Sequence, residues 1–203
     1  MKIRSLALVL FIAAGPIAGH AADTASPDKE GFIHHWLVLA PFSIEGSAGS
    51  EEIDKKQFAD EALPKAIAGE KQKIGDKELE WKKLVSKEFF IDFKDLSGTS
   101  TENVAGWAVA YIVADEEMKG LSLKMNSNDQ GKVYLNGKEL AKFTDTRSLD
   151  KEQEDTAKDV TLKRGVNVLV LKVINEINDW SGSVRFLDAS GKPVTNIRVQ
   201  GTP

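Results

Sequence analysis

The sequence contains no cysteine, so a disulfide framework and cysteine-based metal or redox chemistry are excluded. Histidine is nearly as scarce, with three residues in a chain of 203. There is no excess of basic residues either, because 27 Lys and Arg stand against 31 Asp and Glu, for a formal net charge of −4. Without a basic patch to neutralise phosphates, nucleic acid is not expected as a partner.

The composition is otherwise that of an ordinary folded domain. Hydrophobic residues make up 41% of the chain, enough to bury a core, and the 16 glycines show no three-residue period. Collagen-like and disordered classes are therefore excluded, and the length fits a single domain.

The first residues predict an export signal over residues 1–21. Lys2 and Arg4 precede the apolar run 6–14, and small residues occupy most of 18–21, where cleavage is expected. The apolar run is too short to span a bilayer, so we expect no membrane-spanning segment after cleavage. The mature protein is accordingly predicted to be periplasmic or secreted.

The mature chain is expected to begin with a disordered leader over 22–30, which is polar and contains Pro27. Residues 31–200 are predicted to form a single domain. Its first element is the apolar stretch 32–39, which is rich in β-formers and too short for a good helix. Pro41 is expected to end this strand.

The stretch 43–80 predicts a long excursion from the sheets rather than a domain of its own. Its apolar residues are scattered among charged ones and glycines. Phe58, Ala62 and Leu63 have roughly helical spacing, and Pro64 follows them. We therefore expect one or two short helical turns in this excursion.

The rest of the chain alternates short segments rich in β-formers with turn residues. The expected strands are 89–93, 104–114, 121–125, 132–135, 138–141, 159–162, 167–174, 182–187 and 193–199. Asn136-Gly137 predicts a two-residue hairpin, since a type I′ turn needs positive φ at both central positions. The charged segment 144–158 is expected to be a loop. Many short strands without alternating helices predict an all-β fold, an antiparallel jelly-roll β-sandwich.

Four motifs between residues 31 and 199 resemble those of a set of bacterial secreted domains. They are Trp36-Leu37-Val38-Leu39-Ala40-Pro41-Phe42, the polar loop and strand from Asn126 through Lys138, the segment Leu162 through Val173, and Trp180 through Pro193. These domains have a galactose-binding-like jelly roll and usually accompany carbohydrate-active or other extracellular enzymes as non-catalytic modules. The resemblance implies that fold and that role. Ala40 departs from the pattern, which usually has glycine there.

Catalytic chemistry has little support in the sequence. His34 and His35 are adjacent on a strand, so they point to opposite faces and cannot share a metal ion. No Gly-x-Ser-x-Gly nucleophile elbow occurs. The carboxylates gather in runs such as 115–117 and 150–155, which are typical of a solvated surface rather than of two facing catalytic groups. A hydrolytic enzyme is therefore the least expected function.

The loop Asn126-Ser127-Asn128-Asp129-Gln130-Gly131 imitates the start of a calcium-binding loop. The twelfth position is Gly137 instead of glutamate, so an EF-hand is rejected. The favoured interpretation is a tight polar turn in which Asn128 and Asp129 bond backbone amides and Gly131 takes positive φ. A weak calcium or sugar contact at Asn126, Asn128 and Asp129 is the alternative. No other cofactor is expected.

Aromatic rings are the usual stacking platforms for sugars, and tryptophan is the main candidate type. The candidates are Trp36, Trp81, Trp107 and Trp180. Trp180 follows Asn178 and Asp179 outside any obvious apolar strand, so it is the best exposed candidate. Packing of its ring over the sandwich edge is favoured over ligand stacking, which is the alternative.

Two functions remain in competition after these exclusions. The favoured hypothesis is an exported, non-catalytic β-sandwich module that binds a glycan, with Trp180, Asn178 and Asp179 as candidate ligand-binding residues. The alternative is a protein-interaction or assembly subunit of an envelope or secreted complex, with an exported protein as partner.

Overall fold

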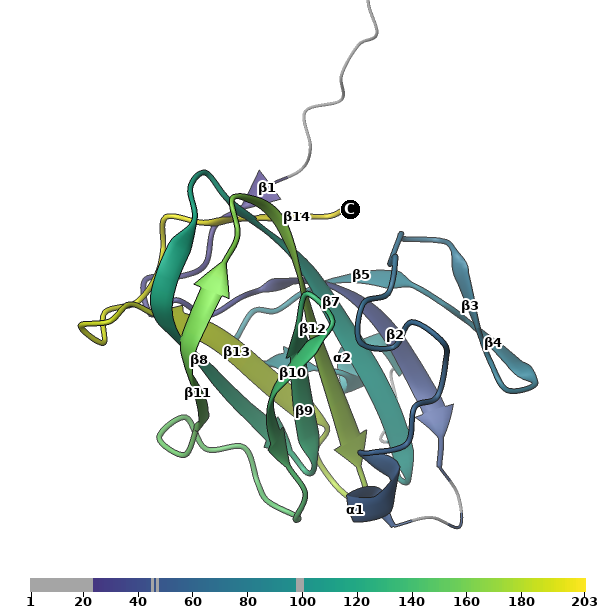
Figure 1. Ribbon diagram of the computed structural model, residues 1–203. Coiled ribbons are helices and arrows are strands. Elements are labelled where there is room, and N and C mark those ends of the chain that lie inside the picture. The colour runs from purple at the N-terminus through teal and green to yellow at the C-terminus, as the bar shows by residue number, and fades with distance from the viewer. Residues whose placement is uncertain (1–23, 45, 47, 98–100) are drawn as a thin grey trace, which may run out of the picture.

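The protein is an antiparallel β-sandwich, which confirms the predicted all-β fold (Figure 1). The computed structural model describes residues 24–44, 46, 48–97 and 101–203. The predicted signal peptide over 1–21 lies outside the described residues. Every strand ladder in the described part of the chain is antiparallel. Among these residues no helix has the length and apolar character needed to cross a bilayer.

Two sheets form the sandwich. The larger sheet has eight strands, namely β1 (Thr24–Ala25), β2 (His35–Ser43), β5 (Lys82–Val85), β7 (Val104–Ala114), β9 (Gly131–Leu135), β10 (Lys138–Phe143), β12 (Gly165–Asn175) and β14 (Arg198–Gln200). The smaller sheet has four, namely β6 (Ile91–Asp92), β8 (Met118–Asn128), β11 (Asp155–Leu162) and β13 (Ser181–Leu187). From β6 onward the chain passes repeatedly between the two sheets, as a jelly roll does.

The remaining elements are a two-stranded hairpin and two short helices. The hairpin consists of β3 (Lys71–Ile74) and β4 (Lys77–Glu80), and the helices are α1 (Gly49–Glu52) and α2 (Lys94–Ser97). The order of the larger sheet is β1-β14-β7-β12-β9-β10, and β2 pairs with both β7 and β5. The order of the smaller sheet is β11-β8-β13-β6. The edge strands β10 and β11 lie beside each other, and register shifts interrupt the pairing of both.

The strands with the strongest local signals are where the sequence predicts them. β7 has the predicted bounds, and Asn136 and Gly137 form the predicted turn, with φ of 51° and 83°. The loop predicted over 144–158 ends earlier, because β11 begins at Asp155 and pairs with β8. β2 continues through Pro41 to Ser43, so this proline does not end the strand.

The leader predicted to be disordered is ordered over its described part, 24–30. β1 pairs with β14 at the far end of the chain, and Asp28 accepts hydrogen bonds from the amides of Glu30 and Phe32, both at 2.9 Å. Its other carboxylate oxygen lies 3.1 Å from Nε2 of His34. The prediction of disorder was wrong because the partners that order this segment are supplied by tertiary structure.

Both faces of the larger sheet are buried. Between the sheets lies the main core, to which Val133, Leu171 and Phe186 belong. The outer face of the larger sheet carries a second apolar cluster, including Leu39, Trp107 and Val170. The excursion after β2 covers this outer face, so the molecule has a third, irregular layer (Figure 1).

The excursion is held by side chains at its centre rather than by regular helices. The predicted helical spacing around Phe58 is not realised as a helix, and the helical turn of α1 lies earlier in the chain. Phe58 packs edge-on against Trp107 with ring centroids 5.3 Å apart. The hydroxyl of Tyr111 donates to the carbonyl of Ala66 and accepts from its amide, at 2.9 and 2.7 Å.

A buried lysine joins the excursion to the sheet. Lys172 on β12 is fully buried, and its Nζ donates to the carbonyls of Glu52 and Lys55, at 3.0 and 2.7 Å, and to Oε1 of Glu61 at 3.3 Å. Burial lowers the pKa of Lys172. The ammonium also lies 5.7 Å from the ring centre of Trp107.

Gly137→Val tests the hairpin between β9 and β10. A β-branched residue resists the φ of 83° that this turn requires, so we expect the free energy of unfolding to fall by about 1–3 kcal/mol. Gly137→Asn is the control, because asparagine tolerates positive φ and should cost much less. Urea denaturation measures both. An unchanged midpoint for the valine variant would contradict the turn assignment.

Lys172→Met tests the buried pair. The substitution leaves the Glu61 carboxylate buried without its cation, and we expect a loss of about 3–5 kcal/mol in unfolding free energy. The double variant Lys172→Met, Glu61→Gln removes that isolated charge and should recover part of the loss. The single variant Glu61→Gln completes the comparison. If the loss of unfolding free energy in the double variant equals the sum of the losses in the two single variants, the coupling between these residues is refuted.

Candidate ligand-binding cleft

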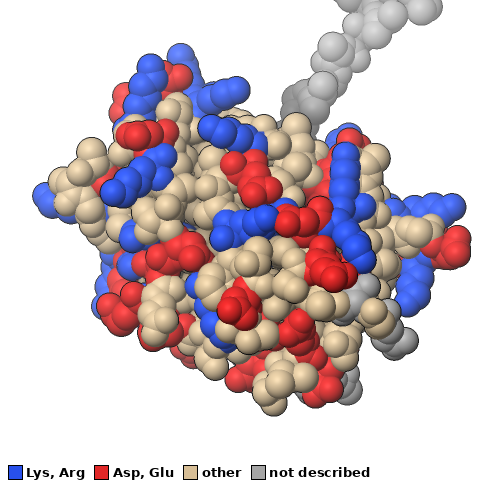
Figure 2. Space-filling model, turned by 60° about the horizontal axis from the view of Figure 1, so that its bottom comes forward, with Lys and Arg blue, Asp and Glu red and all other residues tan. Residues whose placement is uncertain are grey.

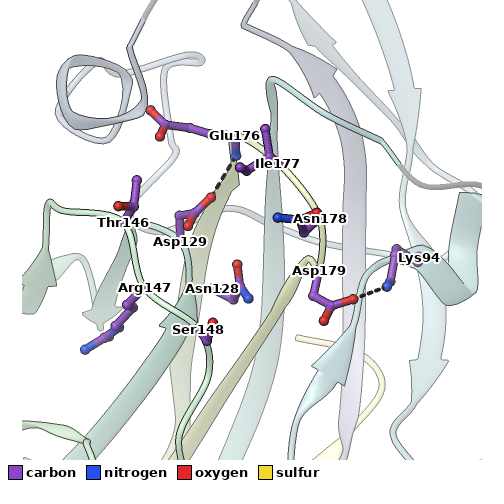
Figure 3. A pocket seen from close by; sticks show the side chains of 10 residues that line it. All are labelled: Lys94, Asn128, Asp129, Thr146, Arg147, Ser148, Glu176, Ile177, Asn178 and Asp179. Carbon is purple, nitrogen blue, oxygen red and sulfur yellow. Dashed lines mark hydrogen bonds and ion pairs between the residues drawn. The ribbon is translucent and has the colours of Figure 1, made fainter.

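A cleft of about 790 Å³ opens at the end of the sandwich where three loops and α2 meet. The loops are those from β8 to β9, from β10 to β11 and from β12 to β13. Its lining residues are Lys94, Asn128, Asp129, Thr146, Arg147, Ser148, Glu176, Ile177, Asn178 and Asp179 (Figure 3). Polar side chains therefore dominate this cleft.

The cleft unites residues that the sequence placed in two separate candidate sites. Asn128 and Asp129 come from the end of β8, and Asn178 and Asp179 come from the loop before β13. Asn126, the remaining candidate of the polar loop, is buried away from the cleft. Its Oδ1 accepts a hydrogen bond from the amide of Ser127 at 2.8 Å, and its Nδ2 donates one to the backbone carbonyl of Asp150.

Asp129 fastens two of the loops together. Its Oδ2 accepts a hydrogen bond from the amide of Glu176 at 3.0 Å, as Figure 3 shows. Burial raises the pKa of the Asp129 carboxyl, and the backbone amides that bond it oppose this shift. A backbone hydrogen bond reinforces this connection, because the amide of Asp129 donates to the carbonyl of Ile174, near the end of β12, at 2.9 Å. Of the predicted polar turn, the part in which Asp129 bonds a backbone amide is present.

One detail of that turn was predicted wrongly. Gly131 does not have positive φ and lies in β9. It is small for another reason, because a Cβ there would lie 2.4 Å from Oγ of Ser127. The requirement for glycine therefore comes from close packing and not from turn geometry.

The charged groups of the cleft are largely paired. Nζ of Lys94 lies 2.5 Å from Oδ1 of Asp179, and this hydrogen bond raises the pKa of Lys94. Arg147 points away from the cleft (Figure 3), with Nη2 2.6 Å from Oδ2 of Asp155 and Nε donating to the carbonyl of Ser127. Figure 2 turns this end of the sandwich forward and shows acidic and basic side chains interspersed.

A second hollow of about 290 Å³ continues the cleft. The two hollows share four lining residues, Lys94, Asn128, Ser148 and Asp179. The wall of the second hollow includes the apolar residues Phe89, Phe90 and Leu149, the polar residues Asp92 and Ser181, and the buried Trp180. We call the two hollows together the end groove. One half of this groove is polar, and the other has an aromatic wall.

Sequence reasoning missed the aromatic wall because it placed Phe89 and Phe90 in a strand. β6 comprises only Ile91 and Asp92, so the two phenylalanines precede it and are half-buried. Their rings meet edge to face with centroids 5.1 Å apart, and Phe89 also packs on Phe32 at 5.3 Å. Two adjacent aromatic residues at the start of a strand were the available signal.

Trp180, the best candidate for an exposed aromatic residue, is fully buried and therefore offers no exposed stacking face. Its ring stacks on Phe93 with centroids 4.8 Å apart, and its Nε1 donates to the carbonyl of Val173 at 3.3 Å. Gly106 leaves room for it, since a Cβ there would lie 2.6 Å from the indole. Of the two alternatives, packing at the sandwich edge is the one observed.

The structure gives no support for a metal centre in the described residues. No group of three or more histidine, aspartate or glutamate side chains is placed there to hold an ion. Oδ2 of Asp129 already accepts from the amide of Glu176. The weak calcium contact at the polar loop therefore stays a prediction.

Comparison with known proteins reveals only distant likenesses. No protein-family model matches the chain, and no curated protein matches it. The β-glucuronidase of Ruminococcus gnavus in complex with uronic isofagomine is 19% identical, with a TM-score of 0.41, over 92% of this chain and 30% of that one. The GH31 α-xylosidase of Xanthomonas citri is 10% identical, with a TM-score of 0.35, over 89% of this chain and 18% of that one. This chain spans less than a third of either protein.

Trp180→Ala should destabilise the fold strongly. Removing a fully buried indole leaves a cavity against Phe93, for which we expect a loss of about 3–5 kcal/mol in unfolding free energy. Trp180→Phe keeps most of the ring and should cost clearly less. Thermal unfolding measures both, and a wild-type melting temperature for the alanine variant would show that the indole is not part of the core.

Proposed function

We propose that the protein is an exported, non-catalytic β-sandwich module that binds carbohydrate in the end groove. The observation that carries this proposal is the convergence of amide and hydroxyl side chains, Asn128, Ser148 and Asn178, beside the aromatic wall of Phe89 and Phe90. Export rests on the sequence pattern of residues 1–21.

The chemistry of the groove suits a sugar. A pyranose offers hydroxyl groups around its rim and an apolar C–H face. Asparagine side chains both donate and accept hydrogen bonds, so Asn128 and Asn178 can each meet a pair of hydroxyls. In Figure 3 their side chains lie between the loops that form the polar half. The face of a ring can then rest against Phe90.

The state of the carboxylates supports a binding role over hydrolysis. A glycosidase needs one carboxyl that gives a proton and another that acts on the opposite side of the bond. Asp129 bonds the amide of Glu176, Glu176 accepts from the amide of Gly49 at 2.7 Å, and Asp179 pairs with Lys94. Each of these three carboxylates is engaged in holding loops together.

Asn178→Gly tests carbohydrate binding without straining the backbone. Asn178 has φ of 68°, which glycine accepts, so only the side chain is lost. We expect retention in affinity gels containing xylan, galactomannan, hydroxyethylcellulose or laminarin to weaken at least about tenfold, which is ~1.4 kcal/mol of binding free energy.

Asn103→Gly is the matched control, because Asn103 also has positive φ, at 53°, and does not line the groove. It should bind as the parent does. If the parent chain is retained by none of these polysaccharides and co-purifies instead with an exported protein, the assembly hypothesis replaces this one. Equal retention of the parent and the Asn178 variant would remove the site from the proposal.

A further inference from the structure

The end groove is longer than one compact site. Its two hollows, of about 790 and 290 Å³, meet along the shared residues Lys94, Asn128, Ser148 and Asp179. The ion pair of Lys94 and Asp179 therefore lies at the junction, and Asn128 borders both halves. The chemistry changes across this junction, from amides and hydroxyls to phenylalanine rings.

Such a change of chemistry within one groove fits a ligand of two linked sugar units better than a single sugar. A single sugar ring in the polar half meets the asparagines and leaves the aromatic wall uncovered. A neighbouring ring in the second half meets Phe90, where an apolar face gains from contact with an aromatic side chain. Phe89 is less available, because Phe32 and the Lys151 ammonium pack against it.

The charges around the groove favour an uncharged ligand. Both cations that line the groove have carboxylate partners: Lys94 pairs with Asp179, and Arg147 pairs with Asp155. The guanidinium of Arg147 is also directed away from the groove (Figure 3). Two further carboxylates, Asp129 and Glu176, border the polar half. A uronate or sulfate group there would face carboxylates without gaining a cation, and juxtaposed like charges disfavour binding.

We infer that the end groove binds an uncharged oligosaccharide of at least two units, with one unit hydrogen-bonded by Asn128 and Asn178 and the next stacked on Phe90, and that its carboxylates exclude acidic glycans. This inference rests on the proposed function and assigns its ligand class. It also gives the stacking role, which the sequence suggested for Trp180, to the half-buried Phe90, because the indole of Trp180 borders the same hollow but is fully buried.

Calorimetry with ligands of increasing length tests the two-unit groove. Cello-, xylo-, manno- and laminari-oligosaccharides of one to four units are titrated into the full chain. For at least one series we expect affinity to rise tenfold or more between one unit and three. Phe90→Ala should abolish that rise and leave the affinity for the single unit within about twofold. Phe42→Ala, a half-buried phenylalanine outside the groove, should preserve the rise.

Asp179→Asn tests the exclusion of acidic chains. The substitution keeps the shape of the side chain and removes the carboxylate that pairs with Lys94. Oligogalacturonides of two to four units should bind the parent at least tenfold more weakly than the best neutral series. At low salt this difference in affinity should be smaller for the variant than for the parent, because Lys94 has lost its carboxylate partner. Added salt should restore the difference, because it screens the attraction between Lys94 and the acidic ligand. Asp60→Asn, an exposed carboxylate of the excursion that lines neither hollow, should leave the difference unchanged.

The outcomes separate this inference from the proposed function. Neutral monosaccharide binding as tight as that of the oligomers, or an undiminished rise in Phe90→Ala, overturns the two-unit groove and leaves carbohydrate binding in place. Preference of the parent for oligogalacturonides overturns the charge argument alone. Absence of binding to every series overturns both the inference and the proposed function.

Discussion

The two-sided burial of the larger sheet is the constraint on which the rest of the structure depends. β7 and β12 are apolar on both faces, so a sandwich of two sheets would leave one of those faces in water. The excursion between β2 and β5 solves this by covering the outer face. Its attachment uses few regular hydrogen bonds and relies on Lys172. The ammonium of this lysine donates to the backbone carbonyls of Glu52, Ile53 and Lys55.

The same excursion also shapes the end groove. The amide of Gly49, at the start of α1, donates to Oε1 of Glu176, and a Cβ on Gly49 would collide with Gln130. The loop after β12 is therefore braced by a segment more than a hundred residues earlier in the chain. Asp129 braces it from the other side, so the positions of Asn178 and Asp179 follow from contacts outside their own loop.

Local features of this fold were predictable from sequence, and convergent ones were not. The strand 104–114 and the Asn136-Gly137 turn depend on neighbouring residues, and both were predicted correctly. The burial of Trp180 depends on Phe93 and Gly106, which no pattern around the tryptophan reveals. The groove itself is made by four loops and a helix that meet only in the folded chain, so its residues could be proposed separately from the sequence but not placed together.

The neighbouring edge strands β10 and β11 affect how the protein behaves in concentrated solution. A straight, unprotected strand edge is a template onto which another chain can add, and repeated addition produces fibres. β10 and β11 end their sheets with lysines, Lys138, Lys142 and Lys158, and with interrupted register. A second molecule approaching either edge must bury these charges along an irregular ladder. These two edges are therefore poor templates for the addition of a second chain.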